Sequence, residues 1–498
     1  MQNIAHLIGG EVSSISGSRL SPVYNPATGE QAATVELASK QTMQIAIEKA
    51  HAAFPEWSAR TPIYRARVMS RYKELLMSNK DELAVLVSKE HGKTLDDARG
   101  SITRGIEIVE FACGIPQMLK GEYSANVGTG VDSYNMRQAI GVCAGITPFN
   151  FPAMVPLWMF PVALACGNTF ILKPSEKTPS CPLRMVELAH EAGVPTDALS
   201  VVNGDKEAVD TLLTDERVKA VSFVGSTPIA EYIYHTGSTN NKRVQALGGA
   251  KNHMIVMPDA DTSRVTDALI GSAFGSAGER CMAISVAVCV GEDTANTVRD
   301  AVCAAAAKLK VGPYTDAESN FGPLSNKAHR DKVLSYINTG VEEGAELSFD
   351  GRNVEVVGHE GGYYVGPCVF DNVTTEMTIY KEEIFGPVLA IVRVNSYAEA
   401  LELVDQHELG NGAALFTNNG GVSRHFIEKT QIGMVGINVP IPVPVAYHSF
   451  GGWKRSLFGD HAMHGPEGIR FYTKLKTATV AWPTGVNTGP EFSIPTLS

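Results

Sequence analysis

One cysteine lies in a segment whose composition suits a nucleophile, Gly275-Ser-Ala-Gly-Glu-Arg-Cys-Met-Ala-Ile-Ser285. A thiol becomes reactive when nearby positive charge or helix-terminal N–H groups favour the thiolate, and it needs small neighbours so that a substrate can approach. Residues 275–278 are all small, and Arg280 directly precedes Cys281. On this local sequence alone, packing in a core is the commoner use of such a cysteine, so a catalytic role needs support from other stretches.

A second stretch could supply a hydrogen-bond donor to a developing oxyanion. In Ile146-Thr-Pro-Phe-Asn-Phe-Pro152, an apolar run stops at two prolines and leaves Asn150 at its end. Ligands of α/β sheets bind at the carboxyl ends of the strands, so the residues that follow each apolar run are candidates for a site. A side-chain amide held there could donate to an oxyanion on a substrate carbonyl. The alternative is an ordinary turn asparagine.

Another strand end carries a cation and a carboxylate that suit a nucleotide. In Leu172-Lys-Pro-Ser-Glu176, Lys173 and Glu176 follow an apolar run. Both side chains could reach ribose hydroxyls, and a carboxylate there would repel a 2′-phosphate, which favours NAD over NADP. Taken alone, such a loop is also compatible with solvated polar surface.

Two further stretches could contact a dinucleotide. Phe223-Val-Gly-Ser226 precedes a helical pattern whose N-terminus could hold a pyrophosphate, although the full Gly-x-Gly-x-x-Gly fingerprint is absent. Glu382-Glu-Ile-Phe-Gly-Pro-Val388 offers Glu383 as an acceptor for a ribose hydroxyl and Phe385 as a face for a flat ring. The alternative for the second stretch is a turn before a strand.

The pattern of apolar residues predicts the elements that position these side chains. Helical spacing dominates the first hundred residues, and from about residue 140 short apolar runs alternate with helical stretches, which is typical of βαβ units and largely parallel sheets. The expected strands are 140–146, 169–172, 199–203, 220–224 and 253–257 in a first set, and 286–290, 388–394, 413–416 and 434–438 in a second. Two α/β domains should therefore meet near residues 255–265, and the tail after Trp482 should lie extended.

The composition is that of a globular protein that acts on a small molecule. The chain has 498 residues, of which 44% are hydrophobic and 19% charged, and its formal net charge is −11. Without a long run of Lys and Arg, this charge argues against nucleic-acid and membrane-surface partners. The longest apolar run, 151–166, contains three prolines and is shorter than the ~20 residues that span a bilayer, so we expect it to be buried.

The cysteines and the N-terminus indicate a reducing compartment. The eight cysteines form no Cys-x-x-Cys pair, which disfavours a disulfide scaffold and a structural zinc site. The first residues show neither a signal peptide nor an Arg-rich presequence. We therefore expect a cytoplasmic protein without a bound metal.

The order of the motifs resembles the aldehyde dehydrogenase superfamily. Pro-Phe-Asn-Phe-Pro, Lys-Pro-Ser-Glu, Phe-Val-Gly-Ser, Gly-Glu-Arg-Cys and Glu-Glu-Ile-Phe-Gly-Pro cover nearly the whole chain. The resemblance implies an α/β fold with two Rossmann-like domains and a small oligomerisation extension, in a homodimer or homotetramer. It places the NAD-binding domain in 1–121 and 143–258, the catalytic domain in 259–470, and the oligomerisation segment in 122–142 and 471–498.

The resemblance also implies roles for individual residues. Cys281 would attack an aldehyde, and Asn150 together with the Cys281 backbone N–H would stabilise the oxyanion. Arg280 and Arg104 would bind a substrate carboxylate, although either arginine could instead form an interdomain ion pair. The positions that match NAD-binding residues of the family are Thr147, Phe149, Lys173, Glu176, Lys177, Ser226, Gly248, Glu383 and Phe385.

One residue that departs from the hydrolytic members predicts the second half of the reaction. Hydrolytic relatives carry a glutamate base in Glu-Leu-Gly-Gly-Lys, and this chain has Ala246 at that position. Alanine cannot take a proton from water, whereas a CoA thiol attacks a thioester without a protein base. Residues 245–253, 278–285 and 447–456 moreover resemble the CoA-acylating branch that oxidises methylmalonate and malonate semialdehydes.

The resemblance therefore predicts an NAD-dependent oxidation that yields propionyl-CoA or acetyl-CoA, with loss of CO2 or bicarbonate and CoA as co-substrate. The nearest rival is a hydrolytic aldehyde dehydrogenase that gives a free acid, for which Glu279 would be a candidate base. A non-catalytic NAD-binding protein with the same fold, or a thiolase-like acyl transferase, is a more distant alternative.

Overall fold

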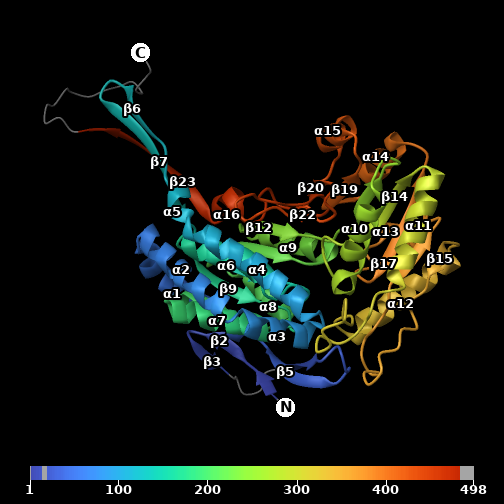
Figure 1. Cartoon of the computed structure of the whole chain (residues 1–498). Helices are drawn as coiled ribbons and strands as arrows, with labels where there is room; N and C mark the ends of the chain where they lie inside the picture. The colour runs from blue at the N-terminus through green and yellow to red at the C-terminus, as the bar shows by residue number, and fades with distance from the viewer. Residues whose placement is uncertain (1, 14–18, 483–498) are drawn as a thin grey trace.

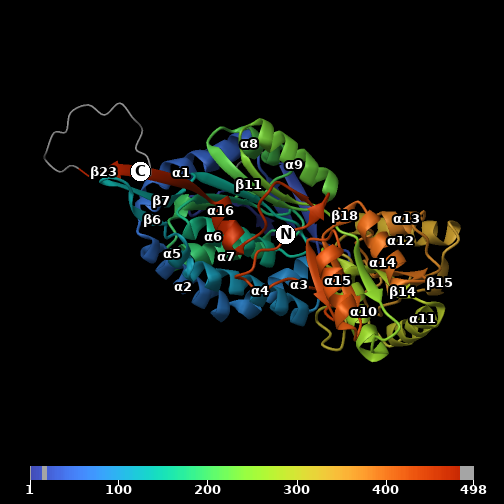
Figure 2. The same cartoon turned by 90° about the horizontal axis from the view of Figure 1, so that it is seen from above.

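Two α/β lobes and a narrow arm make up the molecule (Figure 1). The computed structural model describes residues 2–13 and 19–482, so the predicted extended tail after Trp482 lies outside the described residues. The first lobe is built on an eight-stranded sheet and the second lobe on a seven-stranded sheet. Seen from above, the first lobe lies between the arm and the second lobe (Figure 2).

The central strands of the first lobe are parallel and buried on both faces. The order of the sheet is β22-β12-β11-β8-β9-β10-β2-β3, and the strands at its two edges are antiparallel to their neighbours. Because both faces are covered, the central strands are continuous apolar runs rather than alternating ones. The strands are β2 (His6–Ile8), β3 (Glu11–Ser13), β8 (Val142–Ile146), β9 (Thr169–Lys173), β10 (Leu199–Val201), β11 (Val218–Val224), β12 (Arg243–Leu247) and β22 (Leu457–Phe458).

Helices cover both faces of the first sheet, and each face has its own core. The core on one face includes side chains from α1 (Lys40–Ala59), α8 (Lys206–Thr214) and α9 (Thr227–Thr239). The other core receives α2 (Pro62–Ser78), α3 (Lys80–His91), α4 (Leu95–Cys113), α5 (Ile115–Met118), α6 (Met154–Ala165), α7 (Ser180–Ala192) and α16 (Gly465–Phe471). Helix α6 lies in the apolar run predicted to be buried, and nearly all of it is. A short 3-10 helix, η1 (Thr196–Ala198), precedes β10.

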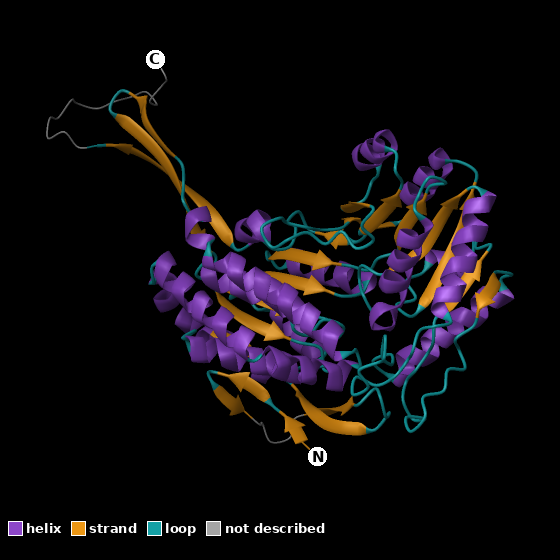
Figure 3. Ribbon diagram, viewed as in Figure 1, coloured by secondary structure: helices purple, strands orange, loops and turns teal. Residues whose placement is uncertain are grey.

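The N-terminal residues form strands that the sequence analysis did not predict. A three-stranded sheet of β1 (Gln2–Ile4), β5 (Gln31–Leu37) and β4 (Arg19–Tyr24) lies at the lower edge of the first lobe (Figure 3). Strands β1 and β4 are largely exposed and β5 mixes buried with exposed residues, so their apolar signal is weak.

The second lobe repeats the arrangement with a second sheet, in the order β15-β16-β17-β14-β13-β19-β20. Its strands are β13 (Asn252–Val256), β14 (Ile284–Val290), β15 (Glu346–Phe349), β16 (Cys368–Asp371), β17 (Val388–Val394), β19 (Gly412–Phe416) and β20 (Met434–Ile437). Its helices are α10 (Thr262–Phe274), η2 (Gly275–Gly278), α11 (Glu292–Ala306), α12 (Lys327–Glu342), α13 (Thr378–Lys381), α14 (Tyr397–Gln406) and α15 (Gly420–Lys429).

The strand predicted at 253–257 belongs to the second sheet and not to the first set. It is β13, which pairs with β14 and β19 in the middle of the second sheet. The chain therefore crosses between lobes in residues 248–251, before the predicted 255–265. An apolar run identifies a strand, but it does not identify the neighbours of that strand. After β20 the chain returns towards the first lobe, where β22 pairs with β12; β18 (Leu409–Gly410) pairs with β21 (Trp453–Lys454).

The arm joins the two segments predicted for oligomerisation. Strand β7 (Val131–Ala139) pairs with β6 (Tyr123–Gly128) and, along its whole length, with β23 (Thr473–Ala481). The three strands project away from both lobes in Figures 1 and 3. No helix within residues 2–13 and 19–482 is long and apolar enough to cross a bilayer.

Candidate active site

Cys281 lies in a tight connection between α10 and β14. Ser276 and Ala277 have φ values of 56° and 52°, and a Cβ on Gly278 would lie 2.1 Å from the Gly386 carbonyl oxygen. Non-glycine residues in this region store strain that packing must hold, and such strain is common at functional sites. The connection thus keeps the cysteine in one place at the interface of the lobes.

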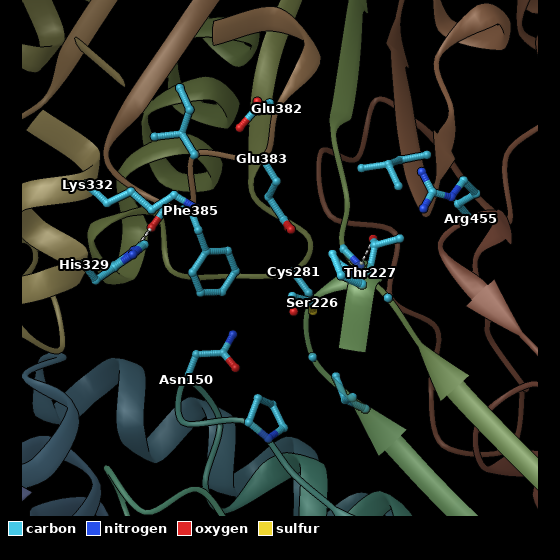
Figure 4. A pocket seen from close by; sticks show the side chains of 18 of the residues that line it. Asn150, Ser226, Thr227, Cys281, His329, Lys332, Glu382, Glu383, Phe385 and Arg455 are labelled. Carbon is cyan, nitrogen blue, oxygen red and sulfur yellow. Dashed lines mark hydrogen bonds between the residues drawn. The ribbon is translucent and has the colours of Figure 1, made fainter. Parts of the chain in front are cut away.

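Two cavities meet at Cys281. The larger has a volume of about 500 Å³, and among its walls are Asn150, Ser226 and Glu383. The smaller has a volume of about 230 Å³ and also includes Cys281 and Gly248 in its wall. Figure 4 shows Cys281, Ser226 and Glu383 around the larger hollow, with Asn150 and Phe385 beside it. A group bound in one cavity can therefore react with a group bound in the other at the Cys281 sulfur.

Asn150 is held at both its main chain and its side chain. Its carbonyl oxygen accepts a hydrogen bond from Lys93 Nζ at 2.8 Å, and its Nδ2 donates to the Glu279 carbonyl oxygen at 3.0 Å. The residue is 4% exposed. One N–H of the amide remains available, so the predicted pair of Cys281 and Asn150 does meet in one cavity.

Five of the nine predicted NAD-binding residues line the larger cavity: Phe149, Ser226, Gly248, Glu383 and Phe385. Ser226 caps the N-terminus of α9, where its side chain makes no capping hydrogen bond and the helix opens on the cavity. The loop that carries the last two residues is fixed by neighbours. Ala250 N donates to Glu383 Oε1 at 3.0 Å, and Phe385 has a φ of 58°.

The other four predicted residues lie outside that cavity wall but form one group at the ends of β8 and β9. Thr147 N donates to the Lys173 carbonyl oxygen at 3.1 Å. Lys173 Nζ donates to the Gly204 carbonyl oxygen at 2.7 Å and lies 3.8 Å from Glu176 Oε2. Lys177 Nζ lies 5.0 Å from the centre of the Phe149 ring, which links this group to the larger cavity.

Both predicted substrate arginines line the smaller cavity, and both have partners. Arg280 Nη2 lies 3.0 Å from Asp97 Oδ1 on α4 of the first lobe, which is the interlobe ion pair considered as the alternative. Arg104 Nη1 donates to Glu107 Oε2 at 2.6 Å, and its Nη2 donates to the Pro444 carbonyl oxygen at 2.6 Å. Each guanidinium has five N–H donors, so these contacts leave donors for a substrate carboxylate.

Asp97 and the apolar walls of the smaller cavity were not predicted from the sequence. Phe151, Met154, Trp158 and Phe450 line it together with the arginines. Asp97 comes from a helix far from Cys281 in sequence, and nothing in its local pattern signals a site. A cavity with apolar walls and a few convergent cations fits a small organic anion.

A scan against family models matches residues 12–478 to the aldehyde dehydrogenase family. This chain belongs to that family. It is 56% identical to the malonate-semialdehyde dehydrogenase of Pseudomonas aeruginosa over 498 residues, which is 100% of each chain. The solved methylmalonate-semialdehyde dehydrogenase of Oceanimonas doudoroffii is 57% identical, with a TM-score of 0.96 over 97% of this chain and 99% of that one.

A second solved structure contains the cofactor. A protein from Sinorhizobium meliloti 1021, in complex with NAD, is 53% identical and has a TM-score of 0.97 over 98% of this chain and 99% of that one. The resemblance inferred from the motifs is therefore confirmed, both for the family and for its malonate- and methylmalonate-semialdehyde branch.

Glu279 of this aldehyde dehydrogenase, the candidate base of a hydrolytic reaction, is buried behind the walls of the two cavities. Its side chain has no exposed surface, and its Oε1 accepts hydrogen bonds from Ser325 N at 3.2 Å and Ser325 Oγ at 2.8 Å. The carboxylate lines neither cavity that meets at Cys281. Burial raises the pKa of Glu279 to about 8. His329, whose Nε2 lies 3.7 Å from Glu279 Oε1, stands between this carboxyl group and the larger cavity.

In the absence of ligands, the surroundings of Cys281 in this aldehyde dehydrogenase disfavour its thiolate form. Burial and the negative charge of Glu383 raise the pKa of the Cys281 thiol to about 11, while Lys93 and Arg280 lower it. Burial raises the pKa of Glu383 itself to about 7. A hydrogen bond from the Cys281 backbone N–H also lowers the pKa of the thiol, so this N–H and the two cations are the groups of the site that favour an ionised sulfur.

Proposed function

We propose that this aldehyde dehydrogenase oxidises malonate and methylmalonate semialdehydes with NAD and transfers the acyl group to CoA. The products would be acetyl-CoA and propionyl-CoA, with loss of CO2 or bicarbonate. The observation that carries the acyl transfer is Ala246 in β12, a residue with no exposed surface and no proton-accepting group at the position of the hydrolytic base. The names of the relatives from Pseudomonas aeruginosa and Oceanimonas doudoroffii, 56% and 57% identical, support the choice of substrate.

The first step would form a bond between Cys281 and the aldehyde. The Cys281 thiolate attacks the carbonyl carbon, and the carbonyl oxygen becomes an oxyanion that accepts hydrogen bonds from Asn150 Nδ2 and the Cys281 backbone N–H. Oriented donors of this kind cost no reorganisation during the reaction, because Asn150 is already fixed by Lys93 and Glu279.

The larger cavity fits a dinucleotide. Its 500 Å³ volume opens on the N-terminus of α9, where unpaired backbone N–H groups suit a pyrophosphate, and Glu383 could accept from a ribose hydroxyl. The residues that would hold NAD are Thr147, Phe149, Lys173, Glu176, Lys177, Ser226, Gly248, Glu383 and Phe385. The chemistry that NAD supplies when bound is the acceptance of a hydride. What then remains on the protein is an acyl thioester at Cys281.

Loss of the carboxylate would follow at the thioester. Cleavage of the bond to the carboxylate leaves an electron pair on the α-carbon, which the thioester carbonyl delocalises onto its oxygen. The same two donors, Asn150 Nδ2 and the Cys281 N–H, would hold that oxygen until the α-carbon takes up a proton.

CoA would complete the reaction as the second substrate. Its thiolate attacks the thioester carbonyl, a new C–S bond forms to CoA, and the bond to Cys281 breaks to release the cysteine thiolate. This exchange needs no base at Ala246. Hydrolysis would need one, and loss of a positioned base typically lowers a rate ~10²–10⁴-fold.

The identity of the acyl product tests the proposal. With malonate semialdehyde, NAD and CoA, mass spectrometry should find acetyl-CoA as the main acyl product and no more than traces of free malonate or acetate. Accumulation of a free acid at the rate of NADH formation would instead support the hydrolytic alternative.

Replacing Arg280 tests the carboxylate site. Charge-assisted hydrogen bonds contribute about 1.5–3 kcal/mol, so Arg280→Leu should raise the KM for malonate semialdehyde ~10–100-fold. The KM for propanal, which has no carboxylate, should change less than ~3-fold. Equal changes for both aldehydes would remove Arg280 from substrate recognition.

The Arg280 variant needs one control, because it leaves Asp97 unpaired in the cavity. An unpaired aspartate would itself repel an anionic substrate. The double variant Arg280→Leu/Asp97→Asn removes both charges, so a KM defect that persists in it reports the lost guanidinium rather than the exposed carboxylate.

We also propose that the first lobe binds NAD, the second lobe contributes the nucleophile, and the arm joins subunits into a homodimer or homotetramer in the cytoplasm. Exposed apolar side chains on the arm, Tyr123 at 61% and Leu475 at 54%, support an interface there. The mass of the purified protein in solution, measured by light scattering, tests the assembly.

A further inference from the structure

Lys93 is a buried cation directly behind the catalytic turn. It follows α3, it is 1% exposed, and its Nζ donates to the Asn150 carbonyl oxygen at 2.8 Å. The same Nζ lies 4.1 Å from the centre of the Phe151 ring, which lines the smaller cavity. One ammonium group thus contacts both the residue that would stabilise the oxyanion and its neighbour in the substrate wall.

Burying an ammonium group costs free energy unless other groups compensate for the lost water. Within residues 2–13 and 19–482, Lys93 Nζ donates a hydrogen bond only to a backbone carbonyl, so the compensation comes from that carbonyl, the Phe151 ring and the charges around it. The titratable groups that act on Lys93 are Asp97, Glu279 and the Cys281 thiolate, which favour its charged form, and Arg280, which opposes it. Lys93 in turn lowers the pKa of the neighbouring His91. A costly cation kept against two residues that line the two cavities, Asn150 and Phe151, is a candidate for a functional role.

We propose that Lys93 is a positioning residue whose ammonium holds the Asn150–Phe151 turn and supplies positive charge that favours the Cys281 thiolate and the oxyanion. The inference rests on the proposed function, since it assumes Cys281 as nucleophile and Asn150 as oxyanion donor. It goes beyond that function because the resemblance and the motifs assign no role to Lys93.

The charge of Lys93 has a limited pH range. Burial lowers the pKa of Lys93 to about 8, and burial raises that of Cys281 to about 11. The groups that act on the thiol are Glu383, which opposes the thiolate, and Lys93 and Arg280, which favour it. The ammonium is present below pH 8 and is lost as the pH rises through 8, so its help to the thiolate should fade between about pH 8 and 9.5.

The test is the rate at which iodoacetamide alkylates Cys281, measured by mass spectrometry of the labelled peptide, in wild type and in Lys93→Met. At pH 7 the variant should react ~10-fold more slowly, which corresponds to one pKa unit in the thiolate fraction. At pH 9.5 the two rates should agree within ~2-fold, because Lys93 is then mostly neutral in the wild type. In the NADH assay with CoA, kcat should fall ~10–100-fold with KM changed less than ~3-fold.

Lys242 provides a matched control. It is another buried lysine, 6% exposed, whose Nζ donates to the carbonyl oxygens of Asp215 at 2.5 Å and Val218 at 2.9 Å. Lys242→Met should lower the melting temperature but leave the alkylation rate of Cys281 unchanged at both pH values. Lys93→Arg should restore most of the rate at pH 7 and, since arginine stays charged, should exceed the wild type at pH 9.5.

Several outcomes would overturn the inference. A ratio of wild-type to Lys93→Met rates that does not change with pH would mean that the lysine acts only through packing. If Lys93→Met does not fold, the test is the alkylation rate of Cys281 in Lys93→Arg at pH 9.5, and a rate no higher than that of the wild type would overturn the inference. Two results would contradict the proposed function itself. One is a wild-type Cys281 that iodoacetamide does not alkylate, and the other is NADH formation that continues after Cys281 has been replaced. Normal Cys281 labelling without dependence on Lys93 would overturn only this inference.

Discussion

Without CoA, NADH formation is expected to stop after about one equivalent per active chain and to continue ~10²–10⁴-fold more slowly than with CoA. Cys281 can still accept the aldehyde and lose a hydride, so one turnover to the thioester remains possible. The next step then lacks its nucleophile, because Ala246 cannot activate water and Glu279 faces Ser325 instead of the cavities. Rapid-mixing absorbance at 340 nm measures both the burst and the slow phase.

Two controls separate acyl transfer from other effects of CoA. Desulfo-CoA, which lacks the thiol, should not restore turnover if the thiol is the nucleophile. Addition of CoA after the burst should start a second phase at the full rate. Steady NADH formation at the same rate with and without CoA would contradict acyl transfer and would leave the hydrolytic alternative in place.

Replacing Cys281 with alanine is expected to remove the steady-state reaction almost completely, with a loss of ~10⁴-fold or more in kcat/KM. The sulfur forms the bond that carries the acyl group. Asn150 only donates a hydrogen bond to the oxyanion, so it cannot replace that bond. The cavity walls, the connection at residues 275–278 and the interlobe pair of Arg280 and Asp97 do not depend on the thiol. The variant should therefore still fold and bind NAD, which fluorescence titration with NADH can measure.

Cys303 is a suitable control for that substitution. Like Cys281 it is partly exposed and carries a free thiol, but it lies on α11, outside the walls of both cavities. Cys303→Ala should retain wild-type activity within ~2-fold, as expected for a substitution away from the site. A Cys281→Ala enzyme that kept more than about one hundredth of the wild-type rate would require another nucleophile.

Local patterns predicted most of the strands that are buried on both faces, because such strands leave continuous apolar runs, but they missed the buried strands β12 and β16. The run at 388–394 coincides with β17. The same patterns could not assign β13 to its sheet, since pairing depends on residues far away in sequence. They also missed strands such as β4, in which only Val23 is fully buried among exposed or half-exposed neighbours.

In the candidate site, too, local patterns predicted some residues and missed those that depend on distant parts of the chain. Cys281 and Asn150 were recognisable from their segments, and the structure places both in the wall of one cavity. The groups that hold them were not recognisable. Asp97 and Lys93 come from the junction of α3 and α4, and the direction of the Glu279 carboxylate depends on a hydrogen bond to Ser325. Such contacts join residues that are far apart in sequence, within a lobe or between the two lobes, and no short segment encodes them.

The arm also sets an order of events during protein synthesis. Its outer strand β23 pairs with β7, and a hydrogen bond between them joins Ser133 to Ala478, 345 residues apart. At the ribosomal speed of ~5–20 residues per second, β7 leaves the ribosome about 17–70 s before its partner strand is made. Until then one edge of the β6–β7 hairpin has no strand to bond, and open edges invite pairing with other chains. The nascent chain therefore passes through a period in which chaperone binding at this hairpin would limit aggregation.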